Sequence, residues 1–461
     1  MGRRTVARMP GSTQRRDSTF LVVLVVGSAI TAIAMGIRAS MGVFLAPITD
    51  DLAMGTGTFA LAMAIQNLAW GVGQPVAGAL ADRHGTRRVL VAGTVFYMLG
   101  MVVMAGSSGA AGLHLSGFLS GVGMAGASFT VVLAAVGRLA PEERRSMALG
   151  IVTSAGSVGQ FLFVPLASVA INAAGWRTAL LLGAVVVAAM AVLCVPMRVE
   201  SSGGGSSNGE PLAVALRRAA GHRSYVLLVV GFFVCGFHVS FIGVHLPKYL
   251  DDVGQTAAVG AMALALIGLF NVVGSLGAGA LGATHSRTRL LALIYGLRAV
   301  VIAAFVLLPV GAPVSLAFGA AMGLLWLSTV PLTSGVVMAQ FGVVHAGTLF
   351  GIAFLSHQVG AFVGIAGGGW VRDATGSYEA WWWVQVVLGV VGAILHLVID
   401  DSPAPAYLRQ SPLDTKSAST PKSSTAHSAT IFPLQNWRAR LGRHPTMDVT
   451  DGTFSPLTGS T

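Results

Sequence analysis

Two arginines and three histidines lie inside long apolar runs, where ionisable side chains are costly. They are Arg38, Arg298, His238, His357 and, nearer the end of a run, His396. A charge at the centre of a membrane helix costs about 2.5–3.5 kcal/mol even on lenient scales, so it usually has a partner. The 17 acidic residues lie between the apolar runs, at their ends or in the tails. An anionic ligand held by a guanidinium–carboxylate contact is therefore the predicted partner of Arg38.

A second interpretation stays open for each of these side chains. Arg38 lies toward one end of its run and could bond backbone carbonyls, and Arg298 has the stronger case for such bonding. His238 and His357 fall near mid-depth, and imidazole titrates near neutral pH, so each could bind the anion or carry a proton. Each could equally be a hydrogen-bonded packing residue.

Neutral polar side chains add candidates of a weaker kind. Membrane helices use such groups to hold neighbouring helices together more often than to bind ligands. The strongest candidates for a central site are Asn67, Asn271 and Gln358. The rest of the set is Gln66, Gln74, Gln160, Thr329, Thr333 and Ser334.

Other kinds of chemistry are not indicated. The sequence has no nucleophile–base constellation, no metal-ligand spacing and no phosphate-binding loop, so we predict no enzyme, no metal and no cofactor. Cys194 and Cys235 both lie in apolar runs, where buried inert thiols are expected.

The elements that carry these residues are twelve apolar segments, each near the roughly 20 residues that cross a bilayer. They are 19–46, 57–81, 89–107, 112–137, 147–172, 177–197, 224–249, 256–283, 289–309, 313–340, 346–371 and 380–399. The chain is 54% hydrophobic and 10% charged, against about 25% charged residues in a soluble domain. This composition predicts an all-α integral membrane protein.

The chain is also duplicated, with an offset of 201 residues. Gly42, Leu45 and Asp50 recur as Gly243, Leu246 and Asp251, and Gly175 falls on Gly376. Such a duplication predicts two pseudo-symmetric six-helix halves, residues 19–197 and 224–400, an organisation typical of secondary transporters.

Arginines gather on one side of the predicted bundle. That side holds Arg83, Arg87, Arg88, Arg138, Arg144, Arg145, Arg217 and Arg218, whereas the other side holds only Arg177, Lys248 and Arg372. The positive-inside rule then places both termini in the cytoplasm of a multi-pass inner (plasma) membrane protein. The distribution explains the net charge of +11 by topology and contact with membrane lipids, without nucleic acid.

Three cytoplasmic segments complete the predicted organisation. They are a basic N-terminal segment (1–18), a linker (198–223) and a disordered tail (401–461), which is rich in Ser, Thr and Pro with little apolar pattern.

The loop after the second segment carries the most specific motif, Gly78-Ala-Leu-Ala-Asp82-Arg83-His-Gly85-Thr86-Arg87-Arg88-Val-Leu90. Gly78 would let two helices approach, Asp82 would cap a neighbouring helix or pair with the arginines, and Gly85 would permit a tight turn. The loop resembles the G-x-L-A-D-R-x-G-R-K-x-x-L loop of the major facilitator superfamily, with Thr86 where Arg is usual. This resemblance implies a twelve-helix fold in which the loop is a conformational latch.

Three shorter segments narrow the resemblance. Residues 144–157, 36–45 and 355–360 look like the corresponding segments of the monocarboxylate porter and bacterial oxalate/formate antiporter group. Proton-coupled monocarboxylate porters carry an Asp and an Arg four residues apart in the eighth helix, but residues 270–275 here read Phe-Asn-Val-Val-Gly-Ser. The usual proton carrier is therefore absent, so a histidine replaces it or the protein exchanges anions.

The resulting prediction is a monomeric secondary transporter that moves a small organic anion, a monocarboxylate or dicarboxylate, by alternating access. Proton symport and anion exchange both stay open. The alternative is an efflux pump for drugs or metabolites of the same superfamily, although the lack of acidic residues in the predicted cavity disfavours cationic drugs.

Overall fold

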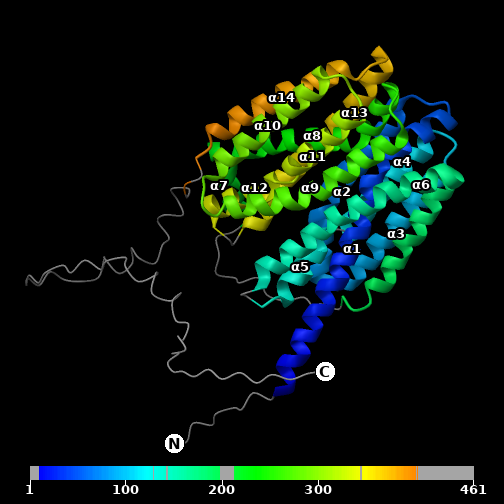
Figure 1. Ribbon diagram of the computed structural model, residues 1–461. Coiled ribbons are helices and arrows are strands. Elements are labelled where there is room, and N and C mark those ends of the chain that lie inside the picture. The colour runs from blue at the N-terminus through cyan, green and yellow to red at the C-terminus, as the bar shows by residue number, and fades with distance from the viewer. Residues whose placement is uncertain are drawn as a thin grey trace, which may run out of the picture. The chain divides into compact units, whose positions relative to one another are not determined.

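The structure is a computed structural model that describes residues 10–127, 129–141, 144–197, 212–342, 345–400 and 402. The described part of the chain is helical and contains no strand. The two halves of the sequence form two neighbouring groups of helices, coloured blue to green and green to orange in Figure 1.

The first half contains α1 to α6. Its helices are α1 (Pro10–Asp51), α2 (Thr56–His84), α3 (Thr86–Ala105), α4 (Ala110–Ala127), α5 (Phe129–Leu139) and α6 (Arg145–Leu193). The long α6 contains two spans, because its backbone turns at Gly175, where φ is +79°. Only glycine adopts this conformation at low cost. The repeat partner Gly376 ends α13 with φ of +73°, so both repeats have a glycine of positive φ at this position.

The second half is preceded by a short helix, α7 (Leu212–Ala220), which carries Arg217 and Arg218. Its spans are α8 (Arg223–Asp252), α9 (Ala257–Leu281), α10 (Arg287–Leu307), α11 (Ala312–Leu325), α12 (Thr329–Phe341), α13 (Ala346–Thr375) and α14 (Glu379–Leu397). Ten helical stretches among the described residues are long and apolar enough to cross a membrane. Adding α2 and dividing α6 at Gly175 gives the twelve spans that the sequence predicts, and this fold class is confirmed.

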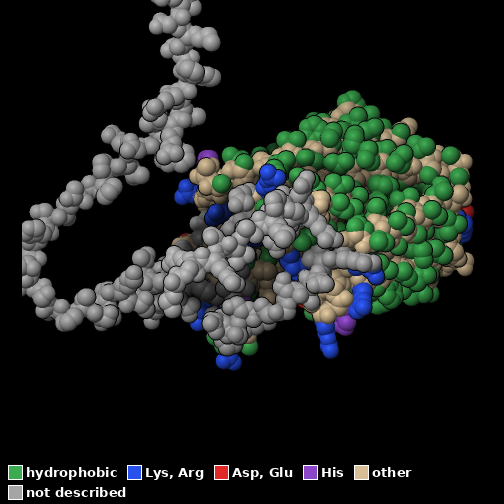
Figure 2. All heavy atoms as spheres, turned by 90° about the horizontal axis from the view of Figure 1, so that it is seen from below, with side chains coloured by type: hydrophobic (Ala, Val, Ile, Leu, Met, Phe, Trp, Pro, Cys, Tyr) green, Lys and Arg blue, Asp and Glu red, His purple; other side chains and the backbone are tan. Residues whose placement is uncertain are grey.

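The two ends of the bundle differ in charge. We call the end that carries the 82–88 loop, the start of α6, the end of α9 and the start of α13 the latch end, and the other the opposite end. Arginine side chains gather at the latch end, whereas hydrophobic side chains dominate the flank of the bundle (Figure 2).

The halves meet through α1 with α8, α2 with α13, and α6 with α9. Glycines permit the closest approaches: a Cβ on Gly42 of α1 would collide with the carbonyl oxygen of Gly243, its own repeat partner in α8. At the opposite end, Asp373 of α13 accepts hydrogen bonds from the backbone N–H groups of Thr56 and Gly57, each at 2.8 Å. Asp373 thus caps the first turn of α2 across the interface between the halves.

Toward the latch end the halves separate. Gly78 of α2, Gly150 of α6, Gly277 of α9 and Gly351 of α13 have nothing within 4 Å of where a Cβ would lie. The hydrogen bonds found between described residues of the two halves lie in the middle of the bundle or at the opposite end. The structure is therefore the conformation that is open toward the latch end.

One span is broken in its middle. The α11 helix ends at Leu325 and α12 begins at Thr329, and Pro331 near the start of α12 has no N–H to offer the preceding turn. The freed backbone groups find side-chain partners. Arg298 donates to the carbonyl oxygens of Leu325 (3.1 Å from Nε and 2.6 Å from Nη2) and Trp326, and Leu327 N–H donates to Asn271 Oδ1 (2.9 Å). The predicted segment 313–340 matches the single apolar stretch Ala312–Phe341, and the helix within it is interrupted between Leu325 and Thr329.

Candidate functional site

Arg38 lies within α1 at the interface between the halves, with its side chain partly buried. Its Nη2 donates to Asn67 Oδ1 of α2 at 2.7 Å. This amide is neutral, and no ion pair among the described residues includes Arg38. The Nε atom is buried and has no hydrogen-bond partner among the described atoms. The guanidinium therefore keeps its full charge and at least one free donor.

Two amide side chains connect Arg38 to the other half. Asn67 Nδ2 donates to the Met63 carbonyl at 2.8 Å, and this bond turns Oδ1 toward Arg38. Gln358 of α13 donates from Nε2 to the backbone carbonyl of Asn67 at 3.0 Å. The structure thus brings together Arg38, Asn67 and Gln358, three of the side chains predicted for the substrate site.

His357 extends this group by one residue. Its Nδ1 lies 3.0 Å from Gln358 Oε1, and its ring stacks on Phe354 with centroids 5.7 Å apart. Phe354 in turn meets Trp70 edge-on at 5.5 Å, and the Arg38 guanidinium lies over Trp70 at 5.1 Å from the ring centroid. A cation against the face of an indole is stabilised by the ring quadrupole, so Trp70 holds the guanidinium in place without neutralising it.

Asn271 lies apart from this group, between α6 and the broken span. Its Nδ2 donates to Ser157 Oγ of the first half at 2.8 Å, while its Oδ1 accepts from Leu327 N–H. Asn271 therefore ties the broken span to the first half of the molecule.

Arg298 and His238 do not lie beside Arg38. Arg298 is fully buried and bonds the carbonyls of the broken span, as the alternative interpretation of this residue predicts. His238 is also fully buried, and its Nε2 bonds the carbonyl oxygen of Gln385 in α14 at 2.8 Å. Their geometry favours internal support of the second half, and we leave both outside the proposed anion site.

The predicted latch shows a different pairing from the one expected. Gly85 takes the tight turn with φ of +88°, but the partner of Asp82 is Arg138 of α5 at 2.8 Å, not a motif arginine. Gly78 faces open space in this conformation, so the close helix approach expected of it is absent here. The latch role of Gly78, Asp82, Arg83, Gly85, Arg87 and Arg88 stays a prediction for the conformation that closes the latch end.

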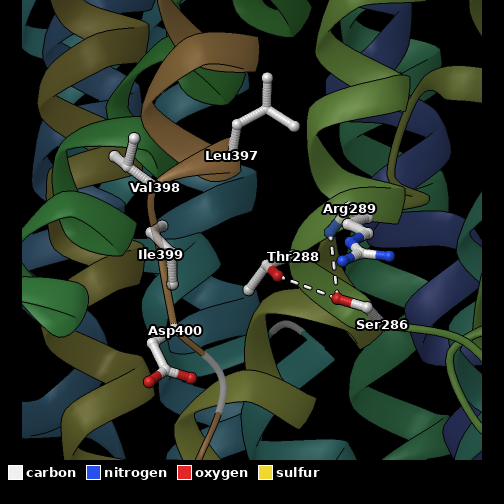
Figure 3. A pocket seen from close by; sticks show the side chains of 7 residues that line it. All are labelled: Ser286, Thr288, Arg289, Leu397, Val398, Ile399 and Asp400. Carbon is white, nitrogen blue, oxygen red and sulfur yellow. Dashed lines mark hydrogen bonds between the residues drawn. The ribbon is translucent and has the colours of Figure 1, made fainter.

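A surface pocket of about 380 Å³ lies at the latch end, and Arg38 is not among its lining residues. Its walls come from the start of α10 and the end of α14, with Ser286, Thr288 and Arg289 opposite Asp400 (Figure 3). Hydrogen bonds from the Ser402 side chain and backbone hold the pKa of the Asp400 carboxyl below its usual range. This ionised carboxylate opposes binding of an anion, so the pocket is not a candidate for the substrate site.

Several contributing residues do not stand out in the sequence. Trp70 and Gly71 are one aromatic and one glycine among many in apolar helices, and a Cβ on Gly71 would lie 2.7 Å from Gln358 Cβ and Cγ. The Cys235 thiol, which the sequence predicts to be inert, lies 3.2 Å from the Thr329 hydroxyl. The only signal for Trp70 is its spacing of three residues from Asn67, which places the two side chains on one face of α2.

Twelve spans in two repeated halves, with a partly buried arginine where the halves meet, define a membrane transporter rather than an enzyme. A sequence model of the Major Facilitator Superfamily matches residues 25–365. The chain belongs to this superfamily.

Curated relatives agree with this assignment. Monocarboxylate transporter 13 of Bos taurus is 28% identical over 408 residues, covering 84% of this chain and 92% of the relative. An uncharacterized MFS-type transporter of Bacillus subtilis is 26% identical over 381 residues, covering 78% and 90%. A probable sugar efflux transporter of Mannheimia succiniciproducens is 25% identical over 293 residues, covering 60% and 72%. The chain is a transporter related to monocarboxylate transporters.

Proposed function

We propose that this protein moves a small organic carboxylate across the inner membrane by alternating access, with Arg38 as the residue that binds the carboxylate. The observation that carries the proposal is the pairing of Arg38. Its guanidinium lies at the interface between the halves, and its hydrogen-bond partner among the described side chains is the neutral amide of Asn67. A partly buried guanidinium without a counter-charge is the arrangement that favours an anionic ligand.

The neighbours of Arg38 support a small ligand. Trp70 covers one face of the guanidinium, and Gln358 reaches across from the second half. A carboxylate on Arg38 would therefore lie next to a contact between the two halves, which is the position from which a ligand can favour their closure. The relatives named monocarboxylate transporters support a carboxylate as the ligand class.

The orientation follows from charge. We place the latch end in the cytoplasm, together with both termini, because Arg83, Arg87, Arg88 and Arg138 lie there. The described conformation is then inward-open. Proton symport and exchange of one anion for another both remain compatible with this site.

A second candidate is export of a neutral metabolite. A relative named as a probable sugar efflux transporter supports this function, and the amides of Asn67 and Gln358 suit hydroxyl groups as well as carboxylates. The charge on the transported compound distinguishes the two functions.

The test is uptake into proteoliposomes of labelled lactate, pyruvate, formate, oxalate, a neutral sugar and a cationic dye. Each compound is offered with an inward proton gradient and again with the same compound inside. We expect carboxylate uptake that Arg38→Gln abolishes, a loss of at least about tenfold, since hydrogen bonds to charged groups contribute about 1.5–3 kcal/mol.

Arg177→Gln is the matched control. Arg177 pairs with Asp51 at the opposite end, where both side chains are 47% exposed, so this change should leave uptake near the wild-type rate. Carboxylate uptake retained by Arg38→Gln at equal protein content would refute the anion site. Transport of the sugar or the dye alone would refute the substrate class.

A further inference from the structure

The surface pocket between α10 and α14 has walls of opposite charge. Arg289, in the first turn of α10, lines one side. Asp400, which lies just beyond the end of α14, lines the other (Figure 3). Both side chains are exposed, and no ion pair found among the described residues joins them. A cation and a carboxylate are therefore both available to a ligand in this pocket.

The positive wall offers hydrogen-bond donors as well as charge. The hydrogen bond found for Arg289 runs from its backbone N–H to Ser286 Oγ at 3.4 Å, so the guanidinium keeps its donors. Ser286 Oγ also lies 3.0 Å from Thr288 Oγ1. Two hydroxyls that share one hydrogen bond leave one hydrogen for a ligand. Because the wall stands at the N-terminal end of α10, the helix dipole also favours an anion there. These features suit a phosphate group.

The negative wall is held in place by neighbouring helices. The Asp400 N–H donates to Ser224 Oγ of α8 at 3.2 Å, and its carbonyl oxygen accepts from Gln340 Nε2 of α12 at 2.7 Å. Ser402 donates to Oδ1 from its N–H at 3.0 Å and from its hydroxyl, whereas Oδ2 has no donor among the described residues. The C-terminal end of α14 lies beside Asp400, and its dipole favours a cation. This wall suits an ammonium group that donates to Oδ2.

The two charges also lie at different depths. Leu397 lies toward the middle of the bundle, Asp400 lies beyond the end of α14, and Arg289 lies at a level between them (Figure 3). The carboxylate is therefore further toward the aqueous end than the guanidinium. In a phospholipid the phosphate joins the glycerol backbone, and a headgroup amine is attached beyond it. The pocket thus presents its charges in the order that such a headgroup requires.

Exposed apolar side chains continue from the pocket along both helices. The helices pack side by side, since a Cβ on Gly296 of α10 would lie 3.8 Å from Ala393 Cβ of α14. Each helix exposes apolar residues at spacings of three or four, which form one face. They are Leu293, Leu297 and Val300 on α10, and Val390, Ile394 and Leu397 on α14. Acyl chains are as apolar as leucine, so these faces can hold the chains of a lipid whose headgroup fills the pocket.

We propose that this pocket binds phosphatidylethanolamine from the leaflet at the latch end. The phosphate lies against Arg289 and the hydroxyls of α10, the ammonium group lies against Asp400, and the acyl chains follow the exposed faces of both helices. An anionic glycerol headgroup brings no cation for the carboxylate, and the trimethylammonium of a choline headgroup has no hydrogen to donate. The pocket therefore selects the ethanolamine headgroup over both. This binding site is independent of the proposed anion site.

Native mass spectrometry of the full-length protein in detergent tests the selection directly. The probes are dioleoyl phospholipids with ethanolamine, N-methylethanolamine, N,N-dimethylethanolamine, choline and glycerol headgroups. We expect the ethanolamine lipid to bind best, and binding to fall most at the choline lipid, where the last N–H is lost. Glycerophosphoethanolamine, which has no acyl chains, is the free headgroup and should bind far more weakly. Equal binding of the free headgroup would refute a lipid as the occupant.

Single substitutions separate the two walls. Arg289→Gln should weaken the binding of each phospholipid by about two- to fivefold, the range expected for an exposed charge pair. Asp400→Asn should spare the phosphate contact and abolish the preference for the ethanolamine over the glycerol headgroup. Arg144→Gln is the matched control, because Arg144 is an exposed arginine at the latch end that does not line the pocket. It should change neither the binding nor the preference.

An exchange of the two charges distinguishes lipid binding from a direct attraction between the side chains. The double variant Arg289→Asp with Asp400→Arg keeps that attraction but presents the charges to a lipid in the reverse order. We expect a melting temperature near that of the wild type and no preference for the ethanolamine lipid. A preference retained by this variant, or by Asp400→Asn, would overturn the proposal. Equal binding of the ethanolamine, choline and glycerol lipids to the wild-type protein would overturn it as well.

Discussion

Arg38 and Arg298 show how neighbours decide what a buried arginine does. Both lie in apolar helices, and both lie beside an aromatic ring, Trp70 at 5.1 Å and Tyr295 at 5.3 Å. Arg298 bonds two backbone carbonyls released by a broken helix, so its donors are largely occupied by the protein. Arg38 lies among unbroken helices and bonds one amide oxygen, which leaves its charge for a ligand.

Gly71 is the residue on which the bridge between the halves depends. Gln358 packs directly against Gly71. The Cβ and Cγ atoms of Gln358 lie 2.7 Å from where a Cβ of residue 71 would be. We expect Gly71→Ala to push Gln358 away from Asn67 and lower the stability by about 1–3 kcal/mol, the usual effect of overpacking. Thermal unfolding in detergent and lactate exchange should both report the loss. Gly277→Ala, at a helical glycine with open space around it, is the control; equal effects of the two changes would contradict this explanation.

At the scale of the elements, the broken span formed by α11 and α12 distinguishes the second half. Irregular backbone at membrane depth requires partners, because each unsatisfied group costs several kcal/mol in lipid. Arg298 and Asn271 supply them from α10 and α9. Asn271 also bonds Ser157 in the first half. A movement of α6 against α9 would therefore strain the hydrogen bond between Asn271 and Leu327 at the break.

Removing the arginine should therefore damage the fold rather than the substrate site. Arg298→Met leaves the carbonyls of Leu325 and Trp326 without this donor, at about 1–3 kcal/mol for each buried group. We expect a lower Tm in detergent. Arg177→Met, which removes only an exposed ion pair, should change the Tm little. An unchanged Tm for Arg298→Met would show that the break has other support.

The sequence predicts most of these helices but few of the contacts between them. Twelve apolar runs, a 201-residue offset and a basic loop identify the halves and the fold, because membrane spans need long apolar runs and leave a local signal. The sequence signal for the break is a pair of helix-capping residues, Ser328 and Thr329, followed by Pro331, which has no backbone N–H to donate. The contacts of Asn271 with Ser157 and of Gln358 with Asn67 join residues far apart in the chain, and no local pattern encodes them.

At the scale of the whole molecule, the described conformation depends on contacts at the opposite end of the bundle. Asp373 is the charged member of these contacts. Its two carboxylate oxygens each accept one N–H from the first turn of α2, and a Cβ on Gly57 would lie 2.9 Å from Oδ2. This cap joins the two halves, whereas the ion pairs of Arg177 and Lys248 each connect residues of a single half.

Asp373→Asn should weaken this closure, because an amide offers one acceptor and no charge. Loss of a helix cap costs about 0.5–2 kcal/mol, which would shift the equilibrium toward the conformation open at the opposite end by roughly 2- to 30-fold. The shift is measurable as a longer distance between spin labels at Ala53 and Gln255, which lie in loops of different halves. Asp251→Asn removes a carboxylate that pairs with Lys248 within its own half and should leave the label distance unchanged. A distance that is equally unchanged in Asp373→Asn would show that the cap does not control closure.

The contact between Gly42 and Gly243 has a mechanical consequence. These two residues occupy equivalent positions in the two repeats, and no space for a Cβ is left between Gly42 and the carbonyl oxygen of Gly243. The two helices have no side chain between them at this contact, so α1 and α8 can pivot about it when one half turns against the other. The 30 residues of α8 extend over about 45 Å, so the far end of this helix is the long arm of a lever whose fulcrum is the glycine pair. A single methyl group added at this contact would shift α8 slightly there and move the far end of the helix by a much larger distance.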